Sequence, residues 1–121
     1  LALSQGNRLI MIPSETNPLA CLDFYQVIET SDVPGGVINI ITGKPGELGK
    51  VISEHSGVDA IWHFGSKKHF SDVESLSISN LKQTFVSDGE GVDWTVTHNP
   101  FLKELLRRSV QVKNIWIPYG E

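Results

Sequence analysis

The sequence predicts an α/β fold: a small, open, mostly parallel sheet with helices on both faces, followed by a further strand near the carboxyl terminus. Short apolar runs rich in β-branched residues alternate with segments of helical periodicity. Clusters of Gly, Pro and Asn mark most of the changes between them. Strands and helices that alternate at this spacing are typical of parallel βαβ units with right-handed connections.

Composition limits the classes of protein to which the chain can belong. It has 121 residues, of which 40% are hydrophobic and 20% charged, and a formal net charge of −4. There is no basic stripe, which speaks against nucleic-acid binding, and no apolar run approaches the ~18 residues of a membrane-spanning helix. The single cysteine excludes a disulfide framework and favours a cytoplasmic location. The first residues, LALSQG, resemble the last turn of a helix, so we expect a part of a longer protein.

The first half of the chain predicts two strands joined by a helix. Residues 8–12 are an apolar run of the length that suits a buried parallel strand. Asn17 is expected to cap the next helix, with Pro18 in its first position and an end near residue 30. The β-branched run at residues 37–42 is the second strand. The apolar face of the helix consists of Leu19, Leu22, Phe24, Val27 and Ile28.

The second half continues the alternation. A short helix is expected to turn Leu48, Val51 and Ile52 inward. Apolar and polar residues alternate near the carboxyl terminus, which predicts a strand that Pro118 ends. The predicted helices cover residues 47–55, a segment after residue 66 that carries Phe70, Val73 and Leu76, and residues 101–108, and the predicted strands cover residues 58–64, 84–86 and 110–117.

Five landmarks in register give the chain a resemblance to a known family. They are GNRLIMIPSE from residue 6, NPLA from residue 17, PGGVINIITG from residue 34, VDAIWHFGS from residue 58 and SNLKQTF from residue 79. In order and spacing, most of residues 1–89 resemble the cofactor-binding domain of aldehyde dehydrogenases. The resemblance implies a Rossmann-like domain, incomplete at its amino terminus, and descent from an NAD(P)-dependent oxidoreductase that acts on aldehydes.

The remainder of the chain departs from the family in length. Residues 107–121, with the run RRSVQVKNIWIP, resemble the family's carboxy-terminal strand, which implies a role in subunit association. Residues 90–106 form a short link and a helix where the family carries its catalytic domain. The WHFGS and WIPYG phrases look most like the second, degenerate unit of aldehyde dehydrogenase family 16. We therefore expect the terminal strand to pair with the rest of the parent chain or with another subunit.

The chemistry of the family needs residues that this chain lacks. Aldehyde oxidation of this type uses a thiolate nucleophile, a general base and a bound nicotinamide. Cys21 falls on the packing face of the first predicted helix, where a small buried hydrophobe is expected. Ser87 stands at the position of the family's glutamate base and cannot act as a carboxylate, and the adjacent Asp88 would point differently. No catalytic residue is expected.

The family's contacts with the cofactor survive in part. The resemblance assigns ribose contacts to a Lys-Pro-Ser-Glu motif, of which Ser14 and Glu15 remain while Ile12 replaces the lysine. It assigns the pyrophosphate to Gly65 and Ser66 at a helix start. Loss of the lysine predicts NAD binding that is weak, vestigial or absent. Further departures are Pro45, Phe70, and Lys67 with Lys68, a pair that could attract phosphate or simply be solvated.

The histidines and tryptophans do not predict a binding site. The histidines have no metal-ligand spacing, so no metal site is expected, and a hydrogen-bonded structural role is expected for His63. The tryptophans are expected to pack in the core or at an interface rather than to form a ligand cage. These residues are His55, His63, His69 and His98, and Trp62, Trp94 and Trp116.

Three hypotheses for function follow. The first is a non-catalytic aldehyde-dehydrogenase-like unit that supports the assembly of a larger NAD(P)-dependent protein. The second is a regulatory module that binds NAD or another nucleotide through Glu15 and Ser66. The third is the NAD(P)-binding portion of an active aldehyde dehydrogenase whose other residues lie elsewhere in the parent.

Overall fold

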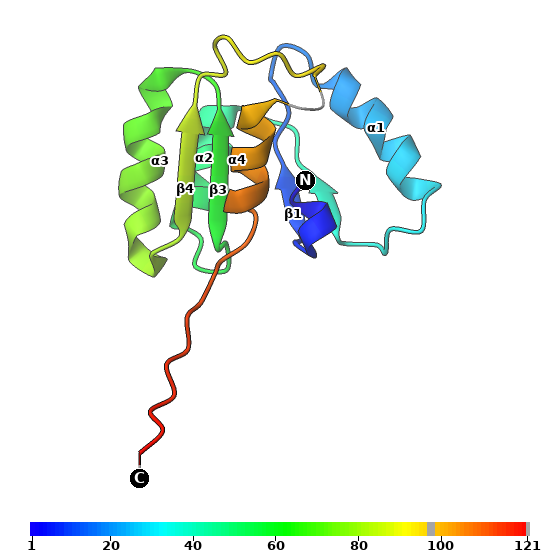
Figure 1. Cartoon of the computed structure of the whole chain (residues 1–121). Helices are drawn as coiled ribbons and strands as arrows, with labels where there is room; N and C mark the ends of the chain where they lie inside the picture. Colours follow the sequence, from blue (N-terminus) through cyan, green and yellow to red (C-terminus); the bar gives the residue numbers. More distant parts are fainter. Residues whose placement is uncertain (97–98, 121) are drawn as a thin grey trace. The chain divides into compact units, whose positions relative to one another are not determined.

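The chain divides into two compact units, each visible as a set of elements in Figure 1. The computed structural model describes residues 1–96 and 99–120, and His98 lies outside the described residues. Unit 1 consists of Leu1–Leu9 and Asp93–Glu121, and unit 2 of Ile10–Val92. Unit 2 therefore contains nearly all of the segment that resembles a cofactor domain.

Unit 2 has the alternation of strands and helices that the sequence predicts. This confirms the α/β class and the Rossmann-like order of elements (Figure 1). The elements are β1 (Leu9–Met11, which begins one residue before the unit boundary), α1 (Leu19–Glu29), β2 (Ile38–Ile40), α2 (Pro45–Glu54), β3 (Ala60–Phe64), the 3-10 turn η2 (Lys67–His69), α3 (Phe70–Leu76), the 3-10 turn η3 (Ser77–Asn80) and β4 (Gln83–Ser87).

The four strands form two short sheets, where the sequence predicted one. Strand β1 pairs with β2, and β3 pairs with β4. The second pair is parallel and places Phe64 opposite Ser87, so the carboxyl ends of β3 and β4 meet at the same edge. Strands β1 and β2 have three residues each, which limits the ladder hydrogen bonds they can form. A pattern of apolar runs predicts that strands exist but not which edges join.

Helix α1 is more exposed than its apolar pattern predicts. Leu19 is 67% exposed, and Cys21 is partly exposed rather than buried. The helix contacts β2, which is too short to cover a face of three turns. The prediction of a buried packing face is therefore wrong for α1, and Val51 of α2 is likewise exposed. The helix also begins at Leu19, with Pro18 rather than Asn17 in the cap position.

The interior of unit 2 contains a buried lysine, Lys82, as well as the buried apolar residue Val73. The Nζ atom of Lys82 donates to the carbonyl oxygens of Ser53 at 2.6 Å and His55 at 2.8 Å. The carbonyls at the end of a helix have no partner within the helix. Lys82 thus caps the carboxyl end of α2, and it comes directly before β4.

Unit 1 joins the first residues of the chain to its last helix. The side-chain amide of Asn7 donates to the carbonyl of Ser109 at 2.8 Å. The side chain of Asn99 caps the helix by accepting from the backbone N–H of Phe101, whose ring packs edge-on against Trp94 with 5.4 Å between centroids. The helices of unit 1 are the 3-10 turn η1 (Leu3–Gln5) and α4 (Pro100–Arg108), and no helix of the described residues is long and apolar enough to cross a bilayer.

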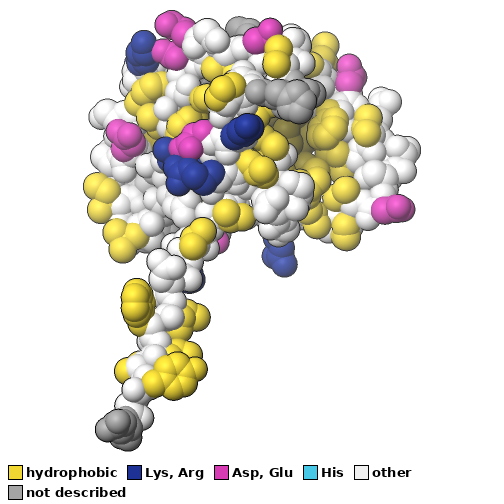
Figure 2. All heavy atoms as spheres, in the orientation of Figure 1, with side chains coloured by type: hydrophobic (Ala, Val, Ile, Leu, Met, Phe, Trp, Pro, Cys, Tyr) yellow, Lys and Arg dark blue, Asp and Glu magenta, His cyan; other side chains and the backbone are white. Residues whose placement is uncertain are grey.

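The strand predicted at residues 110–117 is not formed. No backbone hydrogen bond joins residues 110–120 to another described residue, and a strand exists only where a neighbouring strand accepts and donates its ladder bonds. Arg107 and Arg108, which the resemblance placed with the terminal segment, form the last turn of α4, as the helix predicted at residues 101–108 has them. Figure 2 shows hydrophobic side chains standing along the segment, and Trp116 is 91% exposed.

Candidate functional site

The larger cavity of unit 2 lies where the chain leaves β1 and β2. Its volume is about 200 Å³. That is below the roughly 300–1,000 Å³ of complete small-molecule sites, and it suits a sugar-sized group. In α/β folds, ligands bind beyond the carboxyl ends of the strands. The lining residues are Pro13, Ser14, Glu15 and Pro18 on the β1 side and Thr42, Gly43 and Lys44 on the β2 side.

Two of the predicted cofactor residues, Ser14 and Glu15, line this cavity. The hydroxyl of Ser14 shares a hydrogen bond with that of Thr16 at 2.9 Å. The carboxylate of Glu15 is exposed, and no hydrogen bond or ion pair from the described residues engages it. Ile12 is half-buried and is not among the lining residues. On the other side, Lys44 Nζ lies 3.3 Å from Glu47 Oε1.

Two residues that follow the carboxyl ends of β3 and β4 form an ion pair with each other. Lys67 Nζ lies 2.8 Å from Asp88 Oδ2. The hydrogen bond from Lys67 lowers the pKa of Asp88 below its ordinary value, and the backbone N–H of Glu90 adds to this. The hydroxyl of Ser87, at the position of the family's base, accepts from the N–H of Gly89 at 3.1 Å. Ser87 therefore has a turn-forming role in this structure.

The other predicted cofactor residues, Gly65 and Ser66, lie apart from the larger cavity. They follow β3, and Gly65 donates its N–H to the carbonyl of Ser87 at 3.0 Å. The helix predicted after Ser66, with Phe70, Val73 and Leu76, forms as α3, and the 3-10 turn η2 lies between Ser66 and this helix. A 3-10 turn offers fewer free backbone N–H groups to a pyrophosphate than the first turn of a longer α-helix does. The four predicted residues are thus divided between two places.

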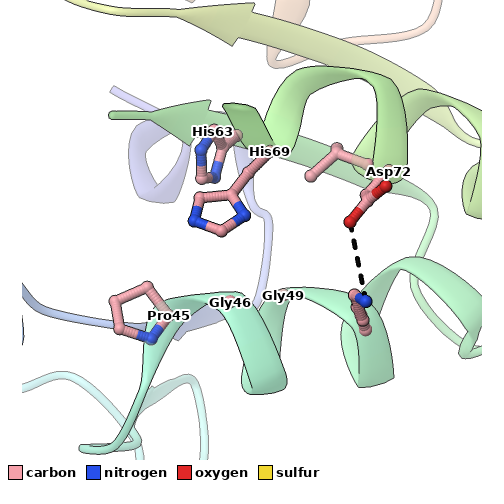
Figure 3. A pocket seen from close by; sticks show the side chains of 8 residues that line it. Pro45, Gly46, Gly49, His63, His69 and Asp72 are labelled. Atoms are coloured by element: carbon pink, nitrogen blue, oxygen red, sulfur yellow. Dashed lines mark ion pairs between the residues drawn. The ribbon is translucent and has the colours of Figure 1, made fainter. Parts of the chain in front are cut away.

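A second, very small cavity lies between α2 and α3 (Figure 3). Its volume of about 10 Å³ is close to the space of one water molecule. His69 fills the rest: a Cβ built on Gly46 would lie 3.1 Å from the His69 ring, so glycine permits this close approach. Figure 3 shows His63 and His69 turned toward each other, with centroids 6.1 Å apart, while Asp72 pairs with Lys50.

Burial lowers the pKa of one of these two histidines, His63. Desolvation lowers the pKa of His63, the charge of His69 lowers it further, and hydrogen bonding with the Ser66 backbone opposes both. The Nε2 atom of His63 is buried and has no hydrogen-bond partner among the described residues. The described residues contain no group of three or more His, Cys, Asp or Glu side chains that could hold a metal ion. His63 and His69 therefore have a packing role between α2 and α3.

Sequence reasoning missed three functional details. Lys44, which lines the larger cavity, was not predicted as a site residue, although a lysine between a strand and the next helix is a signal in the sequence. The pairing of Lys67 with Asp88 has no local signal, because 21 positions separate them. The same holds for Lys82, whose carbonyl partner Ser53 lies 29 positions earlier.

Comparisons with known proteins agree with this geometry. A model of the aldehyde dehydrogenase family matches residues 1–98. The chain is 39% identical to an aldehyde dehydrogenase-like protein of Schizosaccharomyces pombe over 88 residues, which cover 73% of this chain and 18% of that protein. It is 33% identical over 89 residues to the NADP/NAD-dependent aldehyde dehydrogenase PuuC of Escherichia coli, with coverage of 73% and 18%.

Solved structures show the same relationship in space. Aldehyde dehydrogenase C of Pseudomonas syringae, as a mutant in complex with NAD+ and octanal, is 28% identical to the chain with a TM-score of 0.63. The match covers 65% of this chain and 16% of that protein. The chain thus spans less than one fifth of the length of these relatives.

Proposed function

Because this chain belongs to the aldehyde dehydrogenase family, we propose that it is a non-catalytic unit with a structural role in the assembly of a larger aldehyde-dehydrogenase-like protein. The observation that carries this proposal is the segment of residues 110–120, which has apolar side chains and no internal partner among the described residues. Exposed apolar surface of this extent favours burial against another polypeptide. Within this segment, the large apolar side chains that are at least 70% exposed are Val112, Ile115, Trp116, Ile117 and Tyr119.

The non-catalytic part of the proposal rests on the two positions at which the family's chemistry would act. Cys21, the single cysteine of the chain, lies in the first turn of α1, before β2 and β3, and not at the position of the nucleophile. Ser87 at the position of the base carries a hydroxyl that accepts from Gly89. The thiol of Cys21 is therefore not where the family's nucleophile acts, and Ser87 has no carboxylate to act as the base.

A narrower assignment forms part of the same proposal. The WHFGS and WIPYG phrases and the short link between β4 and α4 support a relationship to the second unit of family 16 members. In that setting the terminal segment would pair with the parent chain or with a second subunit, and the protein would be cytoplasmic. The parent would carry an NAD(P)-dependent aldehyde dehydrogenase activity in its other parts.

Association through the terminal segment can be tested with one pair of variants. Ile117 is 70% exposed within the segment, and Ile78 in η3 is 68% exposed outside it. We expect sedimentation of the wild-type chain to show concentration-dependent dimers, with Ile117→Asp shifting them to monomers and Ile78→Asp leaving them unchanged. Equal behaviour of the two variants, or a wild-type monomer at all concentrations, would argue against pairing between copies through this segment.

A second candidate function is nucleotide binding at the larger cavity. It is favoured by the position of Glu15, whose exposed carboxylate can accept a hydrogen bond from a ribose hydroxyl. Titration calorimetry with NAD+ tests it. We expect Glu15→Ala to weaken binding roughly tenfold, the effect of one lost hydrogen bond to a charged group. Ser66→Ala should weaken it less, because Ser66 does not line this cavity.

A further inference from the structure

We propose that the contact between His63 and His69 is a pH-sensitive element, which holds α3 against α2 while both rings are neutral and loosens when they take up protons. The two histidines come from different elements, His63 from β3 and His69 from the end of η2. They meet at the very small cavity between α2 and α3 (Figure 3). This element is independent of subunit association and of nucleotide binding.

The two rings are packed too closely for much solvent to enter. They lie edge to face with 6.1 Å between centroids, and the ring of Phe70 lies 5.8 Å from that of His63. A Cβ built on Gly46 would lie 3.1 Å from Cε1 of His69, so α2 lies directly against this ring. The cavity that remains has a volume of about 10 Å³, room for about one water molecule. Two charged rings would therefore repel each other here with little solvent to screen them.

The Nε2 atom of His63 makes the charged state costly. This atom is buried and has no hydrogen-bond partner among the described residues. In charged imidazole both ring nitrogens are donors, whereas in neutral imidazole one of them is an acceptor. A charged His63 would therefore hold a buried donor without an acceptor at Nε2, and an unpaired buried donor costs free energy. The packed contact thus favours the neutral form of His63.

The charged residues that line the same cavity neutralise each other. Lys50 of α2 and Asp72 of α3 are both lining residues, and their side chains pair at 3.6 Å. Figure 3 shows the carboxylate of Asp72 turned to Lys50 and away from the two histidine rings. Asp72 therefore serves Lys50 rather than a charged histidine.

The neighbouring elements place no counter-charge on the rings. In η2, Lys67 pairs with Asp88 at 2.8 Å and Lys68 is exposed, and both lysines have the same sign as a charged histidine. On β4, the apolar Val86 lies opposite His63. The carboxylates of α2 and α3 that are exposed and do not line the cavity are those of Glu47, Glu54 and Glu74.

Acid loosens this contact because the packed state holds a proton less well than the open state. Desolvation lowers the pKa of His63 from 6.5, the charge of His69 lowers it further, and hydrogen bonding with the Ser66 backbone opposes both. A group with a lowered pKa in the packed state takes up its proton more readily when the contact opens. The stability of the contact is therefore fully present above pH 6.5 and is lost as the pH falls through the lower value of the packed state.

Amide hydrogen exchange of the whole chain between about pH 7.5 and pH 5, corrected for the intrinsic exchange rate, tests the proposal. We expect the protection of residues 70–76 in α3 to fall roughly tenfold over this range, because local opening relieves the buried charge. His63→Phe removes the proton site and keeps a ring beside Phe70, so protection should stay constant within about twofold. His55→Gln is the matched control: it removes an exposed histidine outside the cavity and should keep the pH dependence of the wild type.

NMR titration of the histidine ring signals adds a measurement on the wild-type chain that holds even if His63→Phe does not fold. We expect the pKa of His63 to lie below 6.5, and His69→Gln to raise it by removing the neighbouring positive charge. The proposal is overturned if His63 titrates at pH 6.5 or above, or if His69→Gln leaves its titration unchanged. It is also overturned if α3 of the wild type keeps its protection in acid, or if His63→Phe loses protection as the wild type does.

Discussion

The carboxyl ends of the two short sheets differ in how much of them remains open. Beyond β1 and β2 there is a cavity of about 200 Å³ with an exposed carboxylate at Glu15. Beyond β3 and β4, Lys67 and Asp88 hold each other at 2.8 Å. The first place, where Ile12 stands at the lysine position predicted from the resemblance, has a cavity, whereas the second, with Gly65 and Ser66, has an ion pair. Retention of a motif therefore does not by itself predict an open site.

The difference has a simple geometric cause. Strands β3 and β4 are parallel, and Phe64 lies opposite Ser87. Lys67 and Asp88 follow these two residues closely in the chain, so both emerge at the same edge and their opposite charges attract. The turns that follow β1 and β2 bring Glu15 and Lys44 to one cavity. The ammonium group of Lys44 pairs with Glu47. A lysine and a carboxylate therefore form an ion pair at one edge, whereas at the other edge they line a cavity.

The largest effect is expected from a substitution that destabilises unit 2, which contains both strand pairs. Helix α2 begins at the open cavity, and its carboxyl end is capped by Lys82. We expect Lys82→Met to lower the free energy of unfolding by about 2–4 kcal/mol, because the buried carbonyls of Ser53 and His55 lose their donor. Chemical denaturation measures the change. Lys103→Met, at an exposed position of α4, should have little effect, and an equal loss in both variants would contradict the capping role.

The closed edge can be opened by removing one charge. Asp88→Asn leaves Lys67 without its carboxylate and makes the ends of β3 and β4 more attractive to phosphate. We expect the affinity for NAD+ to rise roughly three- to tenfold in calorimetric titration. Asp93→Asn provides the control, because Asp93 bonds to Thr95 in unit 1. An affinity that is unchanged or lower in Asp88→Asn would show that the ion pair does not restrict this edge.

The smallest effect is expected in unit 1, at a surface carboxylate of α4. Arg107 and Arg108 hydrogen-bond to Glu104 and lower its pKa from 4.5 to about 2. A lowered pKa contributes stability that is present above pH 4.5 and is lost as the pH falls toward 2. The difference in Tm between wild type and Glu104→Gln should therefore shrink over that window, from at most about 2 °C.

Thermal unfolding followed by circular dichroism at several pH values measures this difference. Glu74→Gln, a substitution of the same type at an exposed position of α3, serves as the comparison. A difference between wild type and Glu104→Gln that stays constant from pH 5 to pH 2 would contradict the assigned role of the arginines.

Local signals predicted most elements of unit 2 within a few residues. The apolar runs predicted β2 and β3, and the helix predicted at residues 47–55 forms as α2, which begins two residues earlier at Pro45. The order of landmarks gave the family, which the match over residues 1–98 shows. The candidate site was predicted in part: Ser14 and Glu15 line the open cavity, whereas Gly65 and Ser66 lie at the closed edge. Local periodicity could not predict this division, because it depends on which strands pair.

The sequence by itself determined the alternation of strands and helices and the order of landmarks that places the chain in its family. These properties depend on neighbours in the chain and on residue identity. Only the tertiary structure decided that the strands form two sheets, that Lys67 meets Asp88, that Lys82 caps α2, and that residues 110–120 have no strand partner. The physical reason is that a hydrogen bond or an ion pair between distant residues depends on the path of the chain between them, and the residues alone do not specify that path.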